Sequence, residues 1–399
     1  MTVKPPKYVK ESLRTLEERG FRAFLVGGCV RDLFLGRSPQ DWDVATDATP
    51  EQVMALFENT IPTGIRHGTV TVLLGKGAVE VTTFRREEDY SDHRRPGAVR
   101  YISDLHEDLS RRDFTMNAIA IPLHGIMIDP YGGRADIEKK QIRCVGEAEA
   151  RFTEDALRML RAMRFSAKLG FAVTEETRMA IDACAYLAAH LSAERVRDEV
   201  EKILLSDRPE VIWEVLQAGL LDRFLIKRPA RVPADPKALG RAENHKFQRW
   251  AALCAQLLDM GLISTADGFL KALRLDGKTI SHIRLGVEME KCGLPEDRQG
   301  WKTLLWRYGV QPVLCAAAAA DALEDGGYGK AVKAVLKSGE CFSLKRLAVN
   351  GDDLIGLGYH PGPQVGKALE ALLAHVIRCP ADNKKHTLIA RAAYLLTGD

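Results

Sequence analysis

Two aspartates, Asp41 and Asp43, are separated by a single tryptophan in the stretch RSPQDWDVATDATPEQV, residues 37–53. If this stretch is extended, side chains at i and i+2 share a face, so the two carboxylates lie together and Trp42 points the other way. Two like charges that close repel each other unless a cation lies between them. Oxygen ligands suit Mg²⁺, which takes one or two carboxylates together with substrate phosphates. The pair alone is a weak signal, because surface loops often contain such pairs.

A third acid and a glycine pair strengthen the metal and phosphate interpretation. Glu80 lies in the apolar, β-branched run AVEVTTF. It could be the third carboxylate of a two-metal site, although a lone charge in a strand is usually on the solvated face. Gly27 and Gly28 lie between an expected strand and helix, where backbone N–H groups bind phosphate, and Arg31 adds charge one turn further on. The stretch fits neither GxGxxG nor a Walker loop, which disfavours dinucleotide binding and ATPase activity.

Two further stretches combine arginine with aspartate. RRDF contains Arg111, Arg112 and Asp113, and EDALR contains Asp155 and Arg158, which are i, i+3 neighbours if the stretch is helical. An acid beside an arginine would match a ligand that offers a donor beside an acceptor, and each mismatched contact would cost about 1–3 kcal/mol. In an arbitrary sequence, such pairs are more often solvated ion pairs.

The elements expected around these residues change character near residue 150. YVKESLRTLEERG predicts a helix that stops at Gly20, FRAFLVGG a buried strand, and TVTVLLGKGAVEVTTF a hairpin. A long charged loop is expected over residues 86–110. Beyond 150, amphipathic helices follow one another, beginning with a single helix over TEDALRMLRAMRFSAKLG. Their N-cap candidates are Thr153, Thr174 and Ser192.

The composition sets broad limits on the class of protein. The 399 residues carry a net charge of +3, which permits a polyanionic partner without requiring one. The eight cysteines are scattered without a CxxC pair, so reduced thiols are expected rather than a zinc knuckle or a disulfide framework. No apolar run approaches the roughly 18 residues of a membrane span. We therefore expect a cytoplasmic protein with no membrane partner.

Four stretches, in order along the chain, resemble the motifs of one enzyme family. They are GGCVRDLFLGRSPQDWDVATDATPEQV, DLSRRDFTMNAIA, DPYGGRADIEKKQIRCVG and RFTEDALRMLRAMRFSAKLGF. They are similar to the class II tRNA nucleotidyltransferase branch of the polymerase-β-like superfamily, which also includes poly(A) polymerases. The stretch GDDLIGLGYHPGPQVGKALEALL resembles the bacterial members. The likeness covers nearly the whole chain and is weakest around residues 225–340.

The resemblance implies an α+β fold, with a mixed-sheet nucleotidyltransferase head followed by all-helical domains. The expected catalytic head spans residues 1–145, and a helical neck for base recognition spans 146–210. A helical body and a helical tail, both for tRNA binding, are expected over 211–340 and 341–399.

The resemblance also implies an activity, which is addition of CCA to the 3′ end of tRNA from CTP and ATP. This reaction needs no nucleic-acid template, uses two Mg²⁺ ions and releases pyrophosphate. The resemblance assigns the metal to Asp41 and Asp43, with Glu80 as the third catalytic acid. The ribose is assigned to Arg112 and Asp113. The full set expected at the nucleotide is Gly27, Gly28, Arg31, Arg112, Asp113, Asp155, Arg158, Arg161 and Arg164. The candidates for RNA contact are Lys227, Arg228, Arg231, Lys384 and Lys385.

Several alternatives stay open at this point. One is an enzyme that adds only the terminal A, which would keep the same motifs. Another is a poly(A) polymerase of the same class, although TGIRHGTVTVLL resembles the tRNA branch rather than the arginine-rich segment of that one. A third, from a different class, is an inactive RNA-binding protein, which the presence of all three acids disfavours. The sequence predicts no oligomeric state.

Overall fold

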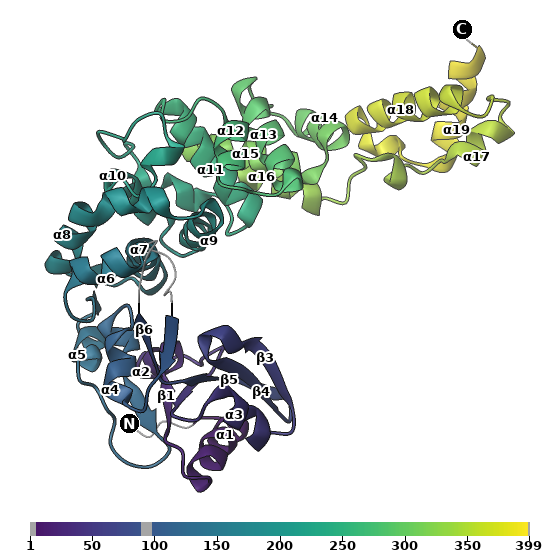
Figure 1. The fold of residues 1–399 in the computed structure, drawn as a ribbon. Coiled ribbons are helices and arrows are strands. Elements are labelled where there is room, and N and C mark those ends of the chain that lie inside the picture. Colours follow the sequence, from purple (N-terminus) through teal and green to yellow (C-terminus); the bar gives the residue numbers. More distant parts are fainter. Residues whose placement is uncertain (1–4, 89–97, 398–399) are drawn as a thin grey trace. The chain divides into compact units, whose positions relative to one another are not determined.

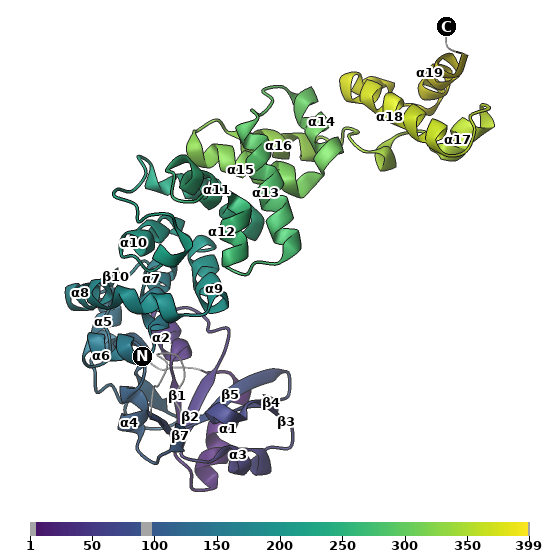
Figure 2. The same ribbon diagram turned by 45° about the horizontal axis from the view of Figure 1, so that its top comes forward.

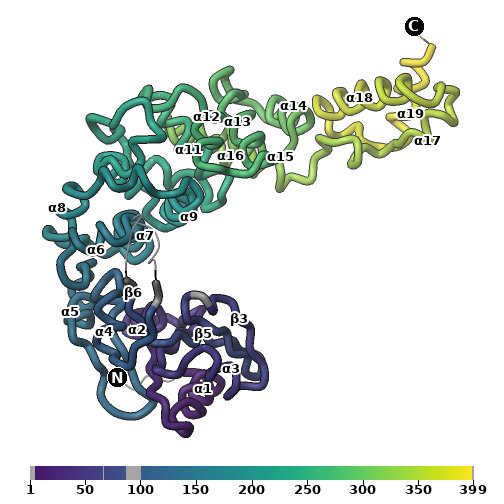
Figure 3. The backbone as a smooth tube through the Cα atoms, viewed as in Figure 1, coloured from purple at the N-terminus to yellow at the C-terminus, as the bar shows by residue number. Residues whose placement is uncertain are grey.

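The computed structural model describes residues 5–88 and 98–397. Contacts within the chain divide it into two compact units, Met1–Arg223 and Phe224–Asp399. Figure 3 traces the backbone, with the residues outside the description in grey. In the described part of the chain, no helix is long and apolar enough to cross a membrane.

The first unit contains a mixed sheet with the strand order β3-β4-β5-β2-β1-β8 (Figure 1). The ladder between β2 and β5 is parallel, and the other ladders are antiparallel. This confirms the predicted mixed sheet, and β4 and β5 form the predicted hairpin with Leu74 opposite Gly77. The strands are β1 (Ala23–Val26), β2 (Asp43–Thr46), β3 (Thr60–Gly64), β4 (Thr69–Leu74), β5 (Gly77–Thr83) and β8 (Ala120–Pro122).

Helices cover both faces of this sheet. On one face, α1 (Lys7–Glu18) and α3 (Pro50–Leu56) contact the strands, and α1 buries a stripe of apolar side chains there. On the other face, α4 (Leu105–Ser110) packs into an apolar cluster with side chains of β1 and β2. The helix α2 (Gly28–Phe34) follows β1 directly. The sheet therefore provides a rigid base for the loops at the ends of β1 and β2.

The segment expected to be a long loop, residues 86–110, contains regular structure. The strands β6 (Arg85–Glu88) and β7 (Ala98–Tyr101) form an antiparallel pair, and α4 follows. The ladder satisfies backbone groups that a loop would leave to water, and the Asp104 side chain caps α4 by accepting the His106 N–H. The loop prediction is therefore wrong for these residues, and its part over 89–97 lies outside the described residues.

The single helix predicted over TEDALRMLRAMRFSAKLG is interrupted. Helix α6 (Ala148–Glu154) ends where Asp155 adopts an extended backbone, with φ −140° and ψ 101°, and α7 (Leu157–Leu169) begins just beyond it. The Asp155 carboxylate accepts the Leu157 N–H at 3.1 Å, a local hydrogen bond that competes with helix formation. Thr153 lies inside α6 and donates to the Glu149 carbonyl, so it does not cap this helix as predicted.

Helix α7 contacts several of the remaining elements of the first unit, among them α9, α10, β9 and β10. Thr174 and Ser192 lie at the predicted N-cap positions of α8 and α9, but neither side chain makes a capping hydrogen bond. Helix α9 packs along α7, which brings its charged side chains to the same region. The elements are α5 (Gly133–Glu138), β9 (Gln141–Ile142), β10 (Ala172–Val173), α8 (Glu175–Cys184), α9 (Ala193–Leu204) and α10 (Ile212–Gln217).

The second unit is helical in its described residues. Helices α11, α13 and α15 pack against one another, and a separate apolar cluster joins α17, α18 and α19 (Figure 2). The four-domain division expected from the sequence stays a prediction. The helices are α11 (Lys246–Asp259), α12 (Ala266–Ala272), α13 (Gly277–Lys291), α14 (Arg298–Tyr308), α15 (Val310–Leu323), α16 (Tyr328–Lys337), α17 (Gly351–Gly356), α18 (Pro363–Arg378) and α19 (Lys385–Thr397).

Candidate active site

The acids of the head meet at the start of β2. Asp43 is the first residue of that strand and is in register with Glu80 of β5 in the parallel ladder, so both side chains project from one face. Burial, followed by the charge of Glu80, raises the pKa of Asp43 to about 6, and Asp41 acts in the same direction. Asp41 itself is exposed and precedes the strand, so the extended geometry assumed from the sequence begins only at Asp43.

These three carboxylates are candidates for holding a divalent cation. They offer oxygen donors alone, which is the ligand set that Mg²⁺ takes in proteins. The mutual repulsion that raises the pKa of Asp43 is what a bound cation would relieve. The donor chemistry of Asp41, Asp43 and Glu80 therefore suits magnesium, although among the described residues these three carboxylates do not form one close cluster of ligand atoms.

Gly27 connects the acids to a group of arginines. It is the N-cap of α2 with φ 75° and ψ −140°, a conformation that side chains rarely allow. A Cβ at this position would lie 3.3 Å from both Arg112 Nη1 and Asp43 Oδ2. The absence of a side chain thus lets the backbone between β1 and α2 approach the two charged groups closely.

Gly27 and Gly28 line a cavity of about 520 Å³. Its described lining includes eight basic side chains and three acidic ones, an excess of positive charge that suits a polyanion such as a triphosphate. All nine predicted nucleotide residues line it, whereas Asp41 and Glu80 are not in the lining. The basic residues are Arg31, Arg111, Arg112, Arg158, Arg161, Arg164, Lys168 and Arg195, and the acids are Asp43, Asp113 and Asp155.

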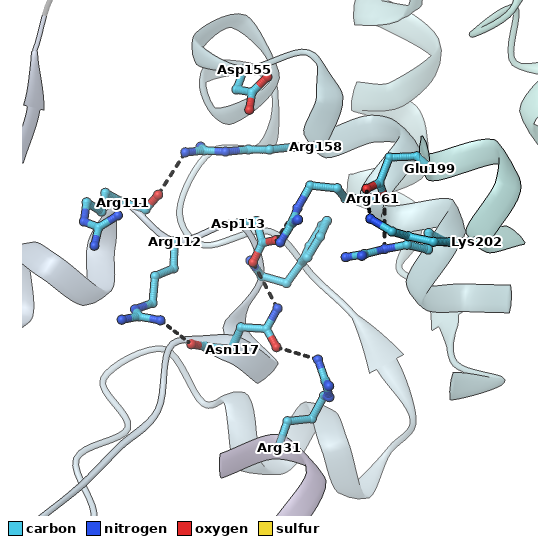
Figure 4. A network of polar contacts seen from close by, with 12 residues as sticks. Arg31, Arg111, Arg112, Asp113, Asn117, Asp155, Arg158, Arg161, Glu199 and Lys202 are labelled. Carbon is cyan, nitrogen blue, oxygen red and sulfur yellow. Dashed lines mark hydrogen bonds and ion pairs between the residues drawn. The ribbon is translucent and has the colours of Figure 1, made fainter. Parts of the chain in front are cut away.

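Asp113 is at the centre of a buried polar network (Figure 4). Its Oδ1 accepts the Phe114 N–H at 2.8 Å and the Asn117 amide at 3.1 Å, and its Oδ2 accepts two bonds from Arg161 at 2.9 and 2.6 Å. Burial alone would raise the pKa of Asp113, but Arg161 and Asn117 outweigh this effect and lower it to about 2. A ribose hydroxyl would therefore have to replace one of these donors to reach the carboxylate.

Asn117 and Asp108, which the sequence analysis did not select, orient the arginines around Asp113. The Asn117 side-chain oxygen accepts from Arg31 Nη1 at 3.0 Å. The fully buried Asp108 pairs with Arg111 at 2.7 Å and with Arg112 at 3.2 Å. The available signal was weak, since it consisted of single polar residues beside apolar ones in DFTMNAIA and HEDLS.

Asp155 and Arg158 both line the cavity but do not share a helix face as predicted, because Asp155 lies in the break before α7. Asp155 Oδ2 accepts from Arg195 Nη2 of α9 at 2.8 Å. Arg158 donates to Glu154 Oε2 at 2.9 Å. It also donates to the Arg111 carbonyl at 2.9 Å (Figure 4). Glu154 and Arg158, four residues apart, thus form an ion pair. Arg195 was missed because it lies 40 residues from its partner, with no local pattern to mark it.

Arg164 links α7 to α9. Its Nε lies 3.0 Å from Glu199 Oε2, and Glu199 also pairs with Lys202 at 3.2 Å. Burial, followed by the charge of Arg161, lowers the pKa of Arg164. Arg164 could brace the helix or contact phosphate. The structure shows the bracing contact and also places Arg164 in the cavity lining.

The candidates for RNA contact all belong to the second unit. Lys227, Arg228 and Arg231 are exposed in an irregular segment before α11. Lys384 is exposed just before α19, and Lys385 pairs with Asp353 of α17 at 2.6 Å. Their contact with RNA stays a prediction.

Comparison with known proteins was made on this basis. The chain matches the families described as Poly A polymerase head domain over residues 23–143, Probable RNA and SrmB- binding site of polymerase A over 170–228, and tRNA nucleotidyltransferase domain 2 putative over 243–392. It is 39% identical over 400 residues to a CCA-adding enzyme of Geobacillus thermodenitrificans, with 97% of each chain covered. It is 38% identical over 388 residues to that of Bacillus subtilis, with 94% of each covered.

Solved structures give the same result. The Bacillus stearothermophilus CCA-adding enzyme in complex with CTP matches with a TM-score of 0.78 and 35% identity, over 99% of each chain. The Thermotoga maritima CCA-adding enzyme complexed with tRNA_CCA shares the fold, with a TM-score of 0.70 at 22% identity over 97% of this chain and 94% of that one. The match of the head and the likeness of the whole chain define the class of protein as a nucleotidyltransferase. Given near-complete coverage at up to 39% identity, the chain belongs to the family of CCA-adding enzymes.

Proposed function

We propose that this protein adds CCA to the 3′ end of tRNA, using CTP and ATP without a nucleic-acid template and releasing pyrophosphate. The observation that carries the proposal is the combination of Asp43, which lies in register with Glu80 and is affected by the charge of Asp41, with a cavity rich in arginine that Asp43 lines. Likeness to CCA-adding enzymes over nearly the full length supports it. This likeness does not favour the alternatives of a poly(A) polymerase or an enzyme that adds A alone.

The head acids would organise the reacting groups. Asp41 and Asp43 would hold Mg²⁺, and Glu80, in register with Asp43, would complete the set. When bound, such ions neutralise phosphate oxygens and activate an attacking hydroxyl. Asp43 lines the cavity, so it would lie between the other two acids and the bound nucleotide.

The triphosphate would bind where the backbone of Gly27 and Gly28 meets the side chains of Arg31, Arg161 and Arg164. Guanidinium groups form paired, charge-assisted hydrogen bonds to phosphate. The ribose is assigned to Arg112 and Asp113. Because Asp113 already accepts four hydrogen bonds, the proposed ribose contact requires an exchange of one donor.

Base selection is assigned to Asp155 and Arg158. The carboxylate can accept the amino group that cytosine and adenine share, and the guanidinium can donate to the adjacent ring nitrogen. Arg195 fixes the first group, while Glu154 and the Arg111 carbonyl fix the second. With uracil or guanine, the carboxylate would face a carbonyl acceptor and the guanidinium would face an N–H donor. Each unmatched contact would cost about 1–3 kcal/mol.

The second unit would contact tRNA through phosphate groups, because an A-form helix shows little sequence in its accessible groove. Lys227, Arg228, Arg231, Lys384 and Lys385 are the proposed contacts. A cytoplasmic location likewise stays a prediction.

Primer extension tests the proposal. Three tRNAs, ending at the discriminator base, at C and at CC, are each offered CTP, ATP, UTP and GTP singly and mixed, with Mg²⁺. We expect two additions of C from CTP, followed by a single A from ATP and a stop. Addition of A to the CC-ended tRNA alone would indicate an A-adding enzyme, and long A tracts a poly(A) polymerase. Tight tRNA binding without any product would contradict the enzymatic assignment.

A further inference from the structure

Three guanidinium groups surround one phenyl ring in the cavity. The Cζ atoms of Arg164, Arg31 and Arg161 lie 4.3, 5.2 and 5.6 Å from the centroid of the Phe165 ring. All three distances are within the range of about 6 Å in which an aromatic ring attracts a cation. Arg31 comes from α2, and the other two come from α7. Phe165 is therefore the common neighbour of cationic groups from two separate elements.

The ring is itself held in place. Phe165 is only 6% exposed, and its ring meets that of Phe114 edge to face, with centroids 5.8 Å apart and planes at 86°. Phe114 follows Asp113, whose carboxylate accepts the Phe114 N–H. The polar network around Asp113 thus also fixes the ring pair, so Phe165 has little freedom to turn.

The three guanidinium groups repel one another, and each also has a carboxylate partner, which is Asp32 for Arg31, Asp113 for Arg161 and Glu199 for Arg164. Burial, the charge of Arg161 and, more weakly, that of Arg31 lower the pKa of Arg164. A further carboxylate would relieve the repulsion, but it would also cancel the charge available to an anion. The face of an aromatic ring attracts guanidinium groups while leaving their net charge intact. An aliphatic side chain of similar volume would fill the space without this attraction.

We propose that Phe165 is a positioning residue for the nucleotide triphosphate, whose ring holds Arg31, Arg161 and Arg164 in a common orientation for phosphate binding. This inference rests on the proposed function, because it assumes that the cavity takes CTP and ATP. The ring acts on the triphosphate, which is shared by both substrates, and Asp155 and Arg158 handle the base independently of it.

Ring fluorination tests the proposal with almost no change of shape. Successive fluorines weaken the attraction of the ring face for cations while the side chain stays aromatic and apolar. In the full chain, position 165 would carry phenylalanine, 4-fluoro-, 3,5-difluoro- or 3,4,5-trifluorophenylalanine. We expect KM for CTP and for ATP to rise together with each fluorine, reaching about tenfold, while the preference for CTP over UTP is unchanged. The same fluorinated series at Phe171, which is buried and outside the cavity lining, should leave both KM values unchanged.

A second pair of variants and a binding readout complete the test. Phe165→Leu should raise both KM values at least as much as the trifluorinated ring does. Phe165→Tyr, which keeps an aromatic ring, should raise them much less than Phe165→Leu. Equilibrium binding of CTP and of inorganic tripolyphosphate should weaken in parallel. Because binding needs no turnover, it separates failure of this inference from failure of the proposed function. Unchanged affinity for tripolyphosphate across the fluorinated series would overturn the inference, as would a loss of base preference accompanying the rise in KM.

Discussion

At the scale of single residues, the surroundings of two carboxyl groups in the site shift their pKa values in opposite directions. Asp43 faces Glu80 in a parallel ladder and is largely removed from water, so its carboxylate gains a proton more easily than a free one. Asp113 shows the opposite behaviour, because Arg161 and Asn117 stabilise its charged form. The first arrangement suits a cation that arrives with the substrate, and the second keeps the Asp113 carboxylate charged for the proposed exchange of one donor for a ribose hydroxyl.

The pKa of Asp43 leads to a prediction for metal-free protein. Folding raises the pKa of this carboxyl from 3.8 to about 6, so its ionisation costs stability that is lost as the pH rises from 3.8 to about 6 and stays lost above that range. Asp43→Asn should therefore raise the free energy of unfolding in EDTA by about 2 kcal/mol at pH 7.5, with little effect near pH 4. The same variant should lose nucleotide transfer. Urea unfolding at both pH values measures the first effect, and an equal shift at the two would contradict the assignment.

Gly27 offers a test of the close approach between α2 and the charged groups. Gly27→Ala places a Cβ 3.3 Å from Arg112 Nη1 and Asp43 Oδ2 and also strains a positive φ. Gly36→Ala is the matched control, because Gly36 has φ 68° but no heavy atom within 4 Å of the added Cβ. Both variants should lose about 1–2 kcal/mol of stability. Only Gly27→Ala should reduce kcat/KM strongly, by about tenfold or more, and similar steady-state kinetics for the two would argue against a role for this contact.

At the scale of elements, the site is assembled by α9 as much as by α7. Helix α9 contributes Arg195, which holds Asp155, and Glu199, which holds Arg164. The break between α6 and α7 turns Asp155 toward α9, so the base-reading pair is fixed from two directions. Base selection should then depend on a helix that does not itself belong to the predicted motif.

Arg195→Met tests this dependence. Loss of the 2.8 Å contact would free the Asp155 carboxylate, so misincorporation of UTP relative to CTP should rise about tenfold, while the affinity for tripolyphosphate stays within twofold. Arg197→Met is the control on the same helix, since Arg197 pairs with the exposed Asp198. Single-turnover addition to a tRNA lacking CCA measures both. Undiminished rejection of UTP in Arg195→Met would show that Asp155 needs no support from α9.

The sequence predicted elements with strong local signals and missed those that depend on distant partners. The hairpin around Gly75 and the helix that stops near Gly20 followed from turn and stop residues alone. The sequence did not predict the break at Asp155, because EDALR also fits a continuous helix. The break includes a hydrogen bond from the Leu157 N–H to the Asp155 carboxylate, which an aspartate in this position can make but need not make. Arg195 could not be selected, since its partner Asp155 lies 40 residues away. Asn117 links Asp113, four residues before it, to Arg31, 86 residues away, and no local pattern marks that second contact. In contrast, all nine predicted nucleotide residues line one cavity.

At the scale of the whole molecule, the two units carry different proposed tasks. The cavity and the three acids belong to Met1–Arg223, and the proposed RNA contacts belong to Phe224–Asp399. Changes in the second unit should therefore alter tRNA affinity and leave nucleotide affinity unchanged.

Lys384 and Lys385 provide a matched pair for this prediction. Lys384 is exposed, whereas Lys385 already neutralises Asp353 at 2.6 Å. Lys384→Met should lower tRNA affinity and reduce the slope of log Kd against log salt concentration by about 0.7–1, the value of one phosphate contact. Lys385→Met should change this slope less. Filter binding of tRNA from 50 to 300 mM KCl measures both slopes. Identical slopes for Lys384→Met and the wild-type protein would show that Lys384 does not contact a phosphate of the tRNA.

The central claim is that a single cavity takes both CTP and ATP and refuses UTP and GTP. Equilibrium dialysis of the full chain with labelled CTP, in Mg²⁺ and without tRNA, tests it most directly. We expect one CTP bound per chain, displaced competitively by ATP and far less readily by UTP or GTP, with binding of CTP and ATP weakened together in Arg158→Ala. Two bound nucleotides per chain, or ATP binding that leaves bound CTP in place, would contradict the account.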